Sequence, residues 1–209
     1  MIQPPQSLIN FKIADLAPFV IEKELPDCSP VHLIMLVGRD DVHEAMKYVL
    51  GGVKRSLFLN MFGFDDDELN ALIMQIVMEP TIVVQITLDK SQAGGVHERK
   101  LLDADRASNL SAFNTHFAVG QSATHSISHT KGFVADGLVG CHGSTNWSND
   151  GEGTFVVAGQ PGGPGFKAQN NSQSFFTDGH SIKVFQDKLI AEHAIALKQS
   201  QTPKVEKAA

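Results

Sequence analysis

Apolar residues in the first half of the chain fall into short continuous runs and into runs with helical spacing. The run 32–37 is compact and mostly apolar and predicts a buried strand, and the runs 56–64 and 81–88 have the same character. The stretch 42–53 places its apolar residues on one helical face, and the stretch 65–80 does so until its final proline. Alternating strands and helices predict an α/β domain built on a parallel or mixed sheet.

The second half is less regular. A weaker helical pattern covers 98–110, and a short strand is predicted at 117–119. The segment 151–173 is rich in glycine, proline and polar residues, which predicts a surface loop. A short strand at 174–176 and an amphipathic helix near the carboxyl terminus complete the pattern.

The length and composition fit one domain. A chain of 209 residues with 42% apolar and 19% charged residues can bury a substantial core and is not disordered throughout. We expect an N-terminal arm over residues 1–31 with at most one short strand. The main domain is expected at 32–199 and a tail at 200–209.

The charge and the absence of sorting signals limit the functions and locations that we expect for this chain. Seventeen basic and 23 acidic residues give a net charge of −6, which disfavours a general binder of nucleic acid or anionic membranes. Two cysteines are too few for a disulfide framework. No apolar run approaches the roughly 20 residues of a membrane helix, and the start of the chain does not resemble a signal peptide. We therefore expect a cytoplasmic protein without a transmembrane segment.

The most informative stretch is a predicted hairpin around the dipeptide at 136–137. Asp-Gly between two apolar runs is a strong signal for a two-residue turn, which would pair Ala135 with Leu138. In that register one face carries His129, Lys131, His142, Ser144 and Asn146. An imidazole, an ammonium, a hydroxyl and an amide without a carboxylate suit an anion, with phosphate the leading candidate.

The same residues follow the spacing HxKx4Dx6GSxN, at His129, Lys131, Asp136, Gly143, Ser144 and Asn146. This spacing resembles the HKD motif of the phospholipase D superfamily. In a chain of this length, six fixed residues at these spacings would occur by chance in roughly a few sequences per million. The resemblance implies a layered α/β/α domain with a central mixed sheet and helices on both faces.

The resemblance also implies a metal-independent attack on phosphodiesters through a phosphohistidine, without a cofactor. His129 would be the nucleophile or the general acid. Three side chains would hold the phosphate oxygens: Lys131, Ser144 and Asn146. Asp136 lies in the turn, too far along the strand to touch the phosphate, so we assign it and Gly143 structural roles.

Four further residues are weaker candidates. Family members often place a carboxylate after the motif to orient the histidine, and here Gln173 occupies the aligned position, with Glu152 as a substitute. His142 reaches the substrate only if the predicted register holds. Trp147 could line a pocket, although packing is the simpler role. No cluster of metal-ligating residues surrounds the motif, so we expect no metal.

The resemblance implies that a second motif histidine protonates the leaving oxygen. The chain carries one complete motif, so we expect a homodimer with a shared active site. Three functions remain open. The first is an endonuclease acting on nucleic acid, and the second is a phospholipase D acting on phospholipid head groups. The third is a non-catalytic module that binds nucleic acid or lipid.

Overall fold

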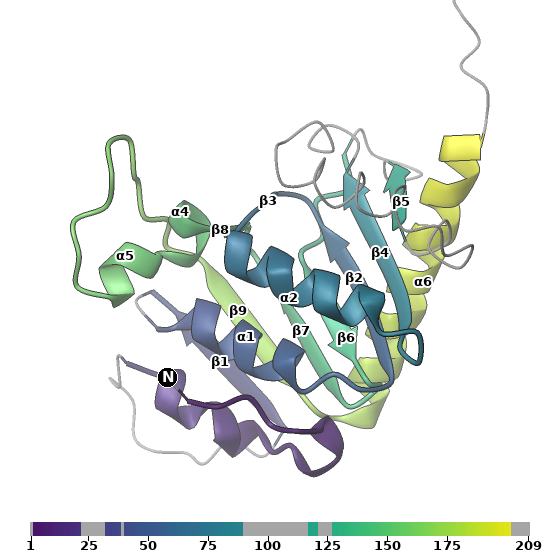
Figure 1. The fold of residues 1–209 in the computed structure, drawn as a ribbon, viewed down its shortest axis with the longest axis horizontal. Helices are drawn as coiled ribbons and strands as arrows, with labels where there is room; N and C mark the ends of the chain where they lie inside the picture. The colour runs from purple at the N-terminus through teal and green to yellow at the C-terminus, as the bar shows by residue number, and fades with distance from the viewer. Residues whose placement is uncertain (1, 22–31, 39, 90–116, 121–126, 202–209) are drawn as a thin grey trace, which may run out of the picture.

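The computed structural model describes residues 2–21, 32–38, 40–89, 117–120 and 127–201. Seven strands form one sheet: β1 (Leu33–Val37), β2 (Ser56–Met61), β4 (Val83–Asp89), β5 (Phe117–Gly120), β6 (Gly132–Ala135), β7 (Val139–Gly143) and β9 (Ser172–Phe176). Their order across the sheet is β1-β9-β7-β6-β2-β4-β5 (Figure 1). A two-stranded ladder joins β3 (Phe64–Asp65) and β8 (Trp147–Ser148) beside this sheet.

The sheet is mixed, as the pattern predicts. Strands β2, β4 and β5 run parallel, whereas β6, β7, β9 and β1 pair antiparallel in turn. Almost every residue of β2 and β4 is buried, which explains why both read as continuous apolar runs rather than alternating ones. Because β2, β4 and β5 are parallel, their carboxyl ends lie at the same edge of the sheet.

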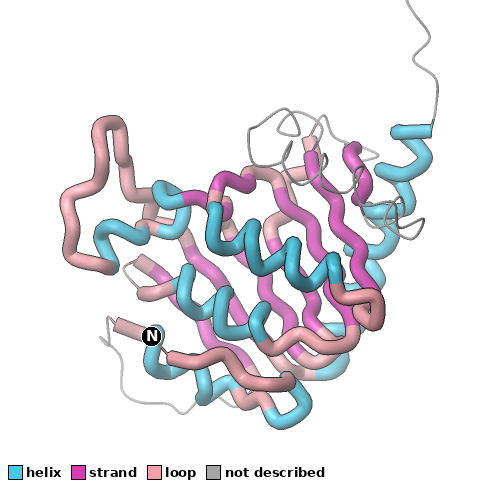
Figure 2. Tube along the Cα trace, viewed as in Figure 1, coloured by secondary structure: helices cyan, strands magenta, loops and turns pink. Residues whose placement is uncertain are grey.

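Helices cover both faces of the sheet. Helices α1 (Val42–Gly51) and α2 (Asp67–Met78) lie on one face, and the long helix α6 (Gly179–Gln201) packs on the other (Figure 2). Helix α6 contacts β2, β4, β5, β6 and β7. The expected layered α/β/α architecture is confirmed. Among the residues described, no helix combines the length and hydropathy needed to cross a membrane.

Aspartates begin both helices on the first face. The Asp41 carboxylate accepts a hydrogen bond from the Glu44 amide, and the Asp66 carboxylate accepts one from the Leu69 amide. Such caps satisfy amide groups that have no partner within the helix. They also place negative charge at the positive end of each helix dipole.

The predicted loop over 151–173 is only partly a loop. It overlaps two short helices, α4 (Asn149–Glu152) and α5 (Thr154–Val157), and β9 begins earlier than expected. The Ser148 side chain caps α4, and Gly153 separates the two helices with a φ of 65°. Each helix spans a single turn, too short for a periodic apolar pattern. The helix predicted at 98–110 lies outside the described residues.

The N-terminal segment packs on the domain instead of extending from it. Residues 2–21 contain two short 3-10 helices, η1 (Leu8–Asn10) and η2 (Ile13–Phe19), and no strand is found in this described part. Four apolar side chains of the segment are buried: Leu8, Ile13, Leu16 and Phe19. They were missed because a 3-10 segment interrupted by proline lacks the period of a helix or a strand.

The hairpin turn has the predicted backbone but a different register. Asp136 and Gly137 have φ values of 56° and 68°, and the Leu138 amide donates to the Ala135 carbonyl. The ladder nevertheless begins with Ala135 opposite Val139, so Leu138 is an extra, unpaired residue. The predicted pairing of Ala135 with Leu138 is therefore wrong by one residue, which changes the face of every later residue in β7.

The Asp136 side chain ties this turn to the start of β2. Its buried carboxylate accepts hydrogen bonds from three consecutive backbone amides, those of Lys54, Arg55 and Ser56. The Asp136 amide in return donates to the Ser56 carbonyl. These contacts place Asp136 at the end of the hairpin remote from His129, and they give it a direct part in holding β6 beside β2.

Candidate active site

The central pair of the site is His129 and Lys131, at the entry to β6. The Lys131 Nζ atom lies 3.0 Å from the His129 Nε2 atom and 3.0 Å from the His129 carbonyl oxygen. Lys131 is only 2% exposed, whereas His129 is exposed at the surface. The structure therefore presents an accessible imidazole backed by a buried ammonium.

This contact fixes the protonation of the imidazole. An ammonium group can only donate, so Nε2 accepts the hydrogen bond and the neutral ring carries its proton on Nδ1. Desolvation lowers the pKa of His129, and the Lys131 charge lowers it further, against the opposing effect of Asp89. Burial also lowers the pKa of Lys131. Near neutral pH His129 is thus an uncharged base.

Two consecutive residues after β2, Phe62 and Gly63, contact the two parts of the motif. The Phe62 ring contacts the His129 ring at a centroid distance of 4.4 Å and lies 5.1 Å from the Lys131 Nζ atom. At Gly63 a Cβ atom would lie 3.2 Å from the Asn146 Cγ atom, so the absence of a side chain lets Asn146 approach. Within the described residues the Asn146 side chain makes no hydrogen bond, and its Oδ1 atom is buried. Phe62 thus joins the site from a position that the motif does not reveal.

A second contribution that the sequence did not reveal comes from the end of β4. The buried Asp89 carboxylate accepts a hydrogen bond of 2.5 Å from the Ser128 amide, which holds the residue next to His129. The Ser128 hydroxyl lies 3.2 Å from the Asn60 Nδ2 atom in β2. The only available signal was the position of Asp89 at the carboxyl end of a buried parallel strand.

His142 does not belong to the site. In the observed register it lies opposite Gly132, so its side chain projects to the face covered by α6. There its ring contacts Phe185 at a centroid distance of 5.2 Å. The expectation that His142 shares a face with Lys131 is wrong because Leu138 adds one residue to the turn.

Ser144, just after β7, and Gln173, in β9, both lie where these two strands pair. The Ser144 hydroxyl donates to the Asn171 Oδ1 atom and accepts from the Ser172 amide, so its single proton is already used. Gln173 is fully buried, and its Nε2 atom donates to the Cys141 sulfur at 3.0 Å. At Gly143 a Cβ atom would come within 2.5 Å of the Gln173 Oε1 atom, which explains the glycine. In the described residues neither Ser144 nor Gln173 contacts the His129 ring.

Glu152 and Trp147 also lie away from the imidazole. The Glu152 carboxylate is buried and lies 2.6 Å from the Nδ1 atom of His43, not of His129. Burial raises the pKa of Glu152 to about 7, although the hydrogen bond with His43 opposes this shift. Trp147 is fully buried and packs edge-on against Phe64 and Phe133, so it belongs to the core.

Comparison with known proteins identifies the fold. No family model matches the chain, and no curated protein sequence matches it significantly. Nuc from Salmonella typhimurium, described as a phospholipase D family member, aligns with a TM-score of 0.53 over 78% of this chain and 95% of its own, at 12% identity. NucT from Helicobacter pylori aligns with a TM-score of 0.52 over 77% of this chain and 96% of its own, at 13% identity. The chain has the fold of the phospholipase D superfamily.

A third similar structure is a phosphatidylserine synthase from Haemophilus influenzae. It aligns with a TM-score of 0.53 and 10% identity over 82% of this chain, which spans 41% of that protein. Within the phospholipase D fold, His129 and Asn146 lie at the sheet edge where β2 and β4 end. Ligands of open α/β sheets bind at this edge.

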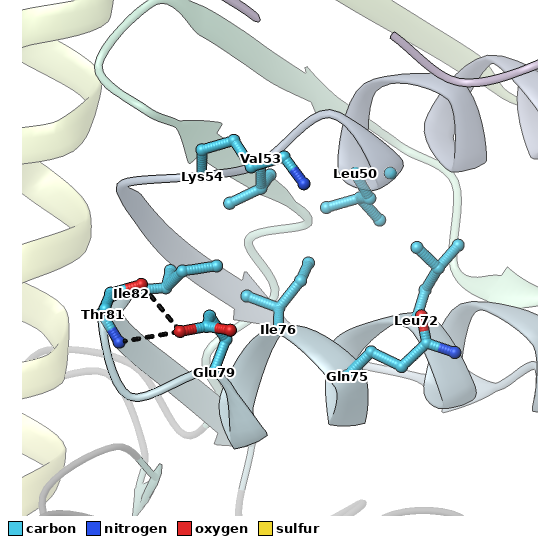
Figure 3. Close-up of a pocket in the computed structure, with 10 residues that line it drawn as sticks. Leu50, Val53, Lys54, Leu72, Gln75, Ile76, Glu79, Thr81 and Ile82 are labelled. Atoms are coloured by element: carbon cyan, nitrogen blue, oxygen red, sulfur yellow. Dashed lines mark hydrogen bonds between the residues drawn. The ribbon is translucent and has the colours of Figure 1, made fainter. Parts of the chain in front are cut away.

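A surface pocket at the opposite edge does not involve the motif. It is lined by residues at the end of α1, at the end of α2 and before β4, among them Leu50, Ile76 and Ile82 (Figure 3). Glu79 accepts hydrogen bonds there from the Thr81 amide and hydroxyl. Because the strands β2 and β4 begin at this edge, the pocket lies away from the His129 imidazole.

Residues that can hold a metal ion are found around His43 rather than His129. Within the described residues, one group consists of His43, Asp66 and Glu152, and the other of His43, Glu44 and Glu68. Sequence spacing did not reveal them because the members come from three separate segments. The reacting groups of the candidate active site are thus an imidazole, an ammonium and an amide, a set suited to an anion.

The His129–Lys131 contact predicts a measurable pKa. His129 should titrate below its ordinary value of about 6.5 in the folded protein, and Lys131→Met should raise that pKa by removing the neighbouring positive charge. Histidine ring NMR across pH 4 to 9, with about ten points, measures both values. Lys183→Met, at an exposed lysine of α6, serves as the control and should leave the pKa of His129 unchanged. A wild-type value above 6.5 would contradict the assigned contact.

Proposed function

We propose that the protein is a metal-independent phosphodiesterase that acts through a phosphohistidine at His129, with nucleic acid as its substrate class. The contact between the buried Lys131 ammonium and the exposed His129 imidazole is the observation that carries the proposal. Attack on a diester needs an uncharged nucleophile and a fixed positive charge beside it. Both groups precede β6 beside the end of β2, at the sheet edge where ligands of open α/β sheets bind, and this position supports the proposal.

The first step is attack of His129 on phosphorus, and it requires the Nε2 lone pair, which now accepts a hydrogen bond from Lys131. An anionic diester oxygen would take over the hydrogen bond from Lys131, which frees Nε2 to attack phosphorus. A nitrogen–phosphorus bond forms, the bond to the leaving oxygen breaks, and a second imidazole donates a proton to that oxygen. Lys131 and Asn146 would stabilise the charge on the pentavalent centre.

The second step returns the enzyme to its starting state. The second imidazole, now neutral, removes a proton from water, and the water oxygen attacks phosphorus. The nitrogen–phosphorus bond breaks, and the product leaves as a phosphomonoester. Splitting one displacement into two lets the same pair of imidazoles act in both steps.

The second imidazole comes from a second copy of the chain in this proposal. The sequence offers no second complete motif, since His180 is not followed by a lysine two residues later. A two-fold dimer would place the two His129 side chains on opposite sides of one phosphate. One copy would attack as the neutral imidazole, while the other, protonated beside the bound phosphate anion, donates its proton to the leaving oxygen.

Nucleic acid is favoured because this compact chain, with one motif copy, resembles small single-motif nucleases. The alignments cover 95% of Nuc and 96% of NucT, which supports a likeness to compact proteins of the phospholipase D fold. The alternative is a phospholipid, supported by the likeness to phosphatidylserine synthase. The net charge of −6 opposes long polyanions, so turnover of phospholipid without turnover of nucleic acid would favour the alternative. Binding of either without turnover would instead indicate a non-catalytic module.

Turnover of a chromogenic phosphodiester in excess chelator tests the chemistry. The wild-type protein should remain active, because no step uses a metal. His129→Asn should lower kcat by about three orders of magnitude or more, since it removes the nucleophile. Lys131→Ala should lower it by about 100-fold or more. Lys183→Ala is the matched control and should have no effect. Loss of activity in chelator with recovery on adding zinc would contradict the proposal.

A mixing experiment tests the shared site. Inactive His129→Asn protein is added to wild type under conditions that allow subunits to exchange. A dimer with one composite site loses activity when either histidine is missing, so a ninefold excess of the variant should leave roughly a tenth of the wild-type activity. A variant prepared with an unrelated exposed substitution, Lys183→Ala, should not inhibit. Unchanged activity in complete exchange, or a fully active monomer by sedimentation, would contradict the shared site.

A further inference from the structure

Three segments far apart in the sequence bring a histidine and two carboxylates together beside the motif. His43 lies in the first turn of α1, Asp66 caps α2, and Glu152 ends α4. One ligand atom from each lies within 4.8 Å of the others. The His43 Nδ1 atom is 2.6 Å from Glu152 Oε2 and 3.5 Å from Asp66 Oδ2. In Figure 1, α4 and the first turns of α1 and α2 lie on the same side of the domain.

Glu152 has an unpartnered oxygen in this cluster. The residue is 3% exposed, and its Oε1 atom is buried without a hydrogen bond, while Oε2 points at His43. A buried carboxylate oxygen without a partner is costly, because it has lost its water and gained nothing in return. This oxygen is therefore available to a positively charged neighbour.

The charges around His43 do not balance. Its imidazole faces three carboxylates, those of Asp66, Glu68 and Glu152. Among the described residues, the other cation paired with these carboxylates is Lys47, which contacts Glu44 as well as Glu68. Four carboxylates thus face two cations, and the cluster carries an excess of about two negative charges when all are ionised.

We propose that His43, Asp66 and Glu152 bind one divalent transition-metal ion, of which Zn²⁺ and Mn²⁺ are the probes. One imidazole nitrogen with carboxylate oxygens is a donor set that such ions accept. Asp66 can serve because only its Oδ1 atom is used by the helix cap, which leaves Oδ2 for the ion. The exposed Glu68 carboxylate and water would complete the coordination.

The distances between His43 Nδ1 and the two carboxylates allow a metal ion to replace the proton that now lies between His43 and Glu152. Donor atoms of a tetrahedral zinc site lie about 3.4 Å apart, close to the 3.5 Å between His43 Nδ1 and Asp66 Oδ2. The shorter contact to Glu152 must open by roughly 0.8 Å as Nδ1 loses its proton to solvent. The His43 side chain is 12% exposed, so the ion has a route from the surface.

A bound ion would also stabilise the segment 144–152, which carries the end of the motif. The Gly151 carbonyl, next to Glu152, accepts a hydrogen bond from the Asn171 side chain. Asn171 in turn accepts the hydroxyl proton of Ser144 in the motif. The ion would thus join α1 and α2 to the segment that carries Ser144 and Asn146. It would stabilise the fold without contacting the substrate, so turnover should persist in chelator while Tm falls. The proposal does not depend on the proposed function.

Calorimetry and thermal unfolding of chelator-treated, desalted protein test the site. Zn²⁺ or Mn²⁺ should bind with a stoichiometry of about one ion per chain and raise Tm by several degrees. Binding should release about one proton, seen by repeating the titration in buffers of different ionisation enthalpy. Glu152→Gln should weaken binding by roughly tenfold or more, as should Asp66→Asn, which keeps a capping side chain.

Two control variants test whether the ion binds at other histidines. His129→Asn and His180→Asn, the latter at an exposed position in α6, should bind the ion as wild type does. If Glu152→Gln fails to fold, NMR of the wild-type histidine rings decides, because Zn²⁺ should perturb the His43 signals first. No saturable binding, equal binding by wild type and Glu152→Gln, or a response confined to His129 or His180 would overturn the proposal.

Discussion

The buried ammonium of Lys131 is the constraint on which the site depends. A charged amine that is 2% exposed must be compensated, and the carbonyl and imidazole of His129 with the Phe62 ring supply that compensation. The same contact sets the tautomer of His129 and holds its ring toward solvent. An incoming anion is the natural further partner of this ammonium, and its arrival would free the nitrogen that attacks. Binding and activation of the nucleophile are thus one event.

The motif residues could be identified from the sequence because their spacing is fixed by a single hairpin. Their geometry could not, because one unpaired residue, Leu138, shifts the ladder and turns His142 to the other face. Phe62 and Asp89 reach His129 through tertiary packing of parallel strands, which leaves no local pattern. Strands covered on both faces and helices with one apolar stripe were predicted well, since a period of two or 3.6 is a local property.

Opposite charges are separated along one edge of the domain. Lys131 and His129 form the part suited to an anion, and the carboxylates around His43 form the part suited to a cation. Hydrogen bonds from Ser144 through Asn171 to Gly151 connect the second part of the motif to the segment that carries Glu152. This separation lets an acidic chain present a local positive charge to a phosphate, although its net charge of −6 still opposes long polyanions.

Mass spectrometry of the enzyme, quenched in alkali during turnover of a diester, tests the central claim most directly. The account predicts a covalent phosphoryl adduct on the peptide that contains His129, stable to alkali and labile to acid. His129→Asn protein incubated with the diester should carry no adduct. Lys183→Ala protein incubated without the diester should carry none either. Turnover by the wild-type enzyme with no adduct, or with the adduct on another residue, would contradict attack by His129.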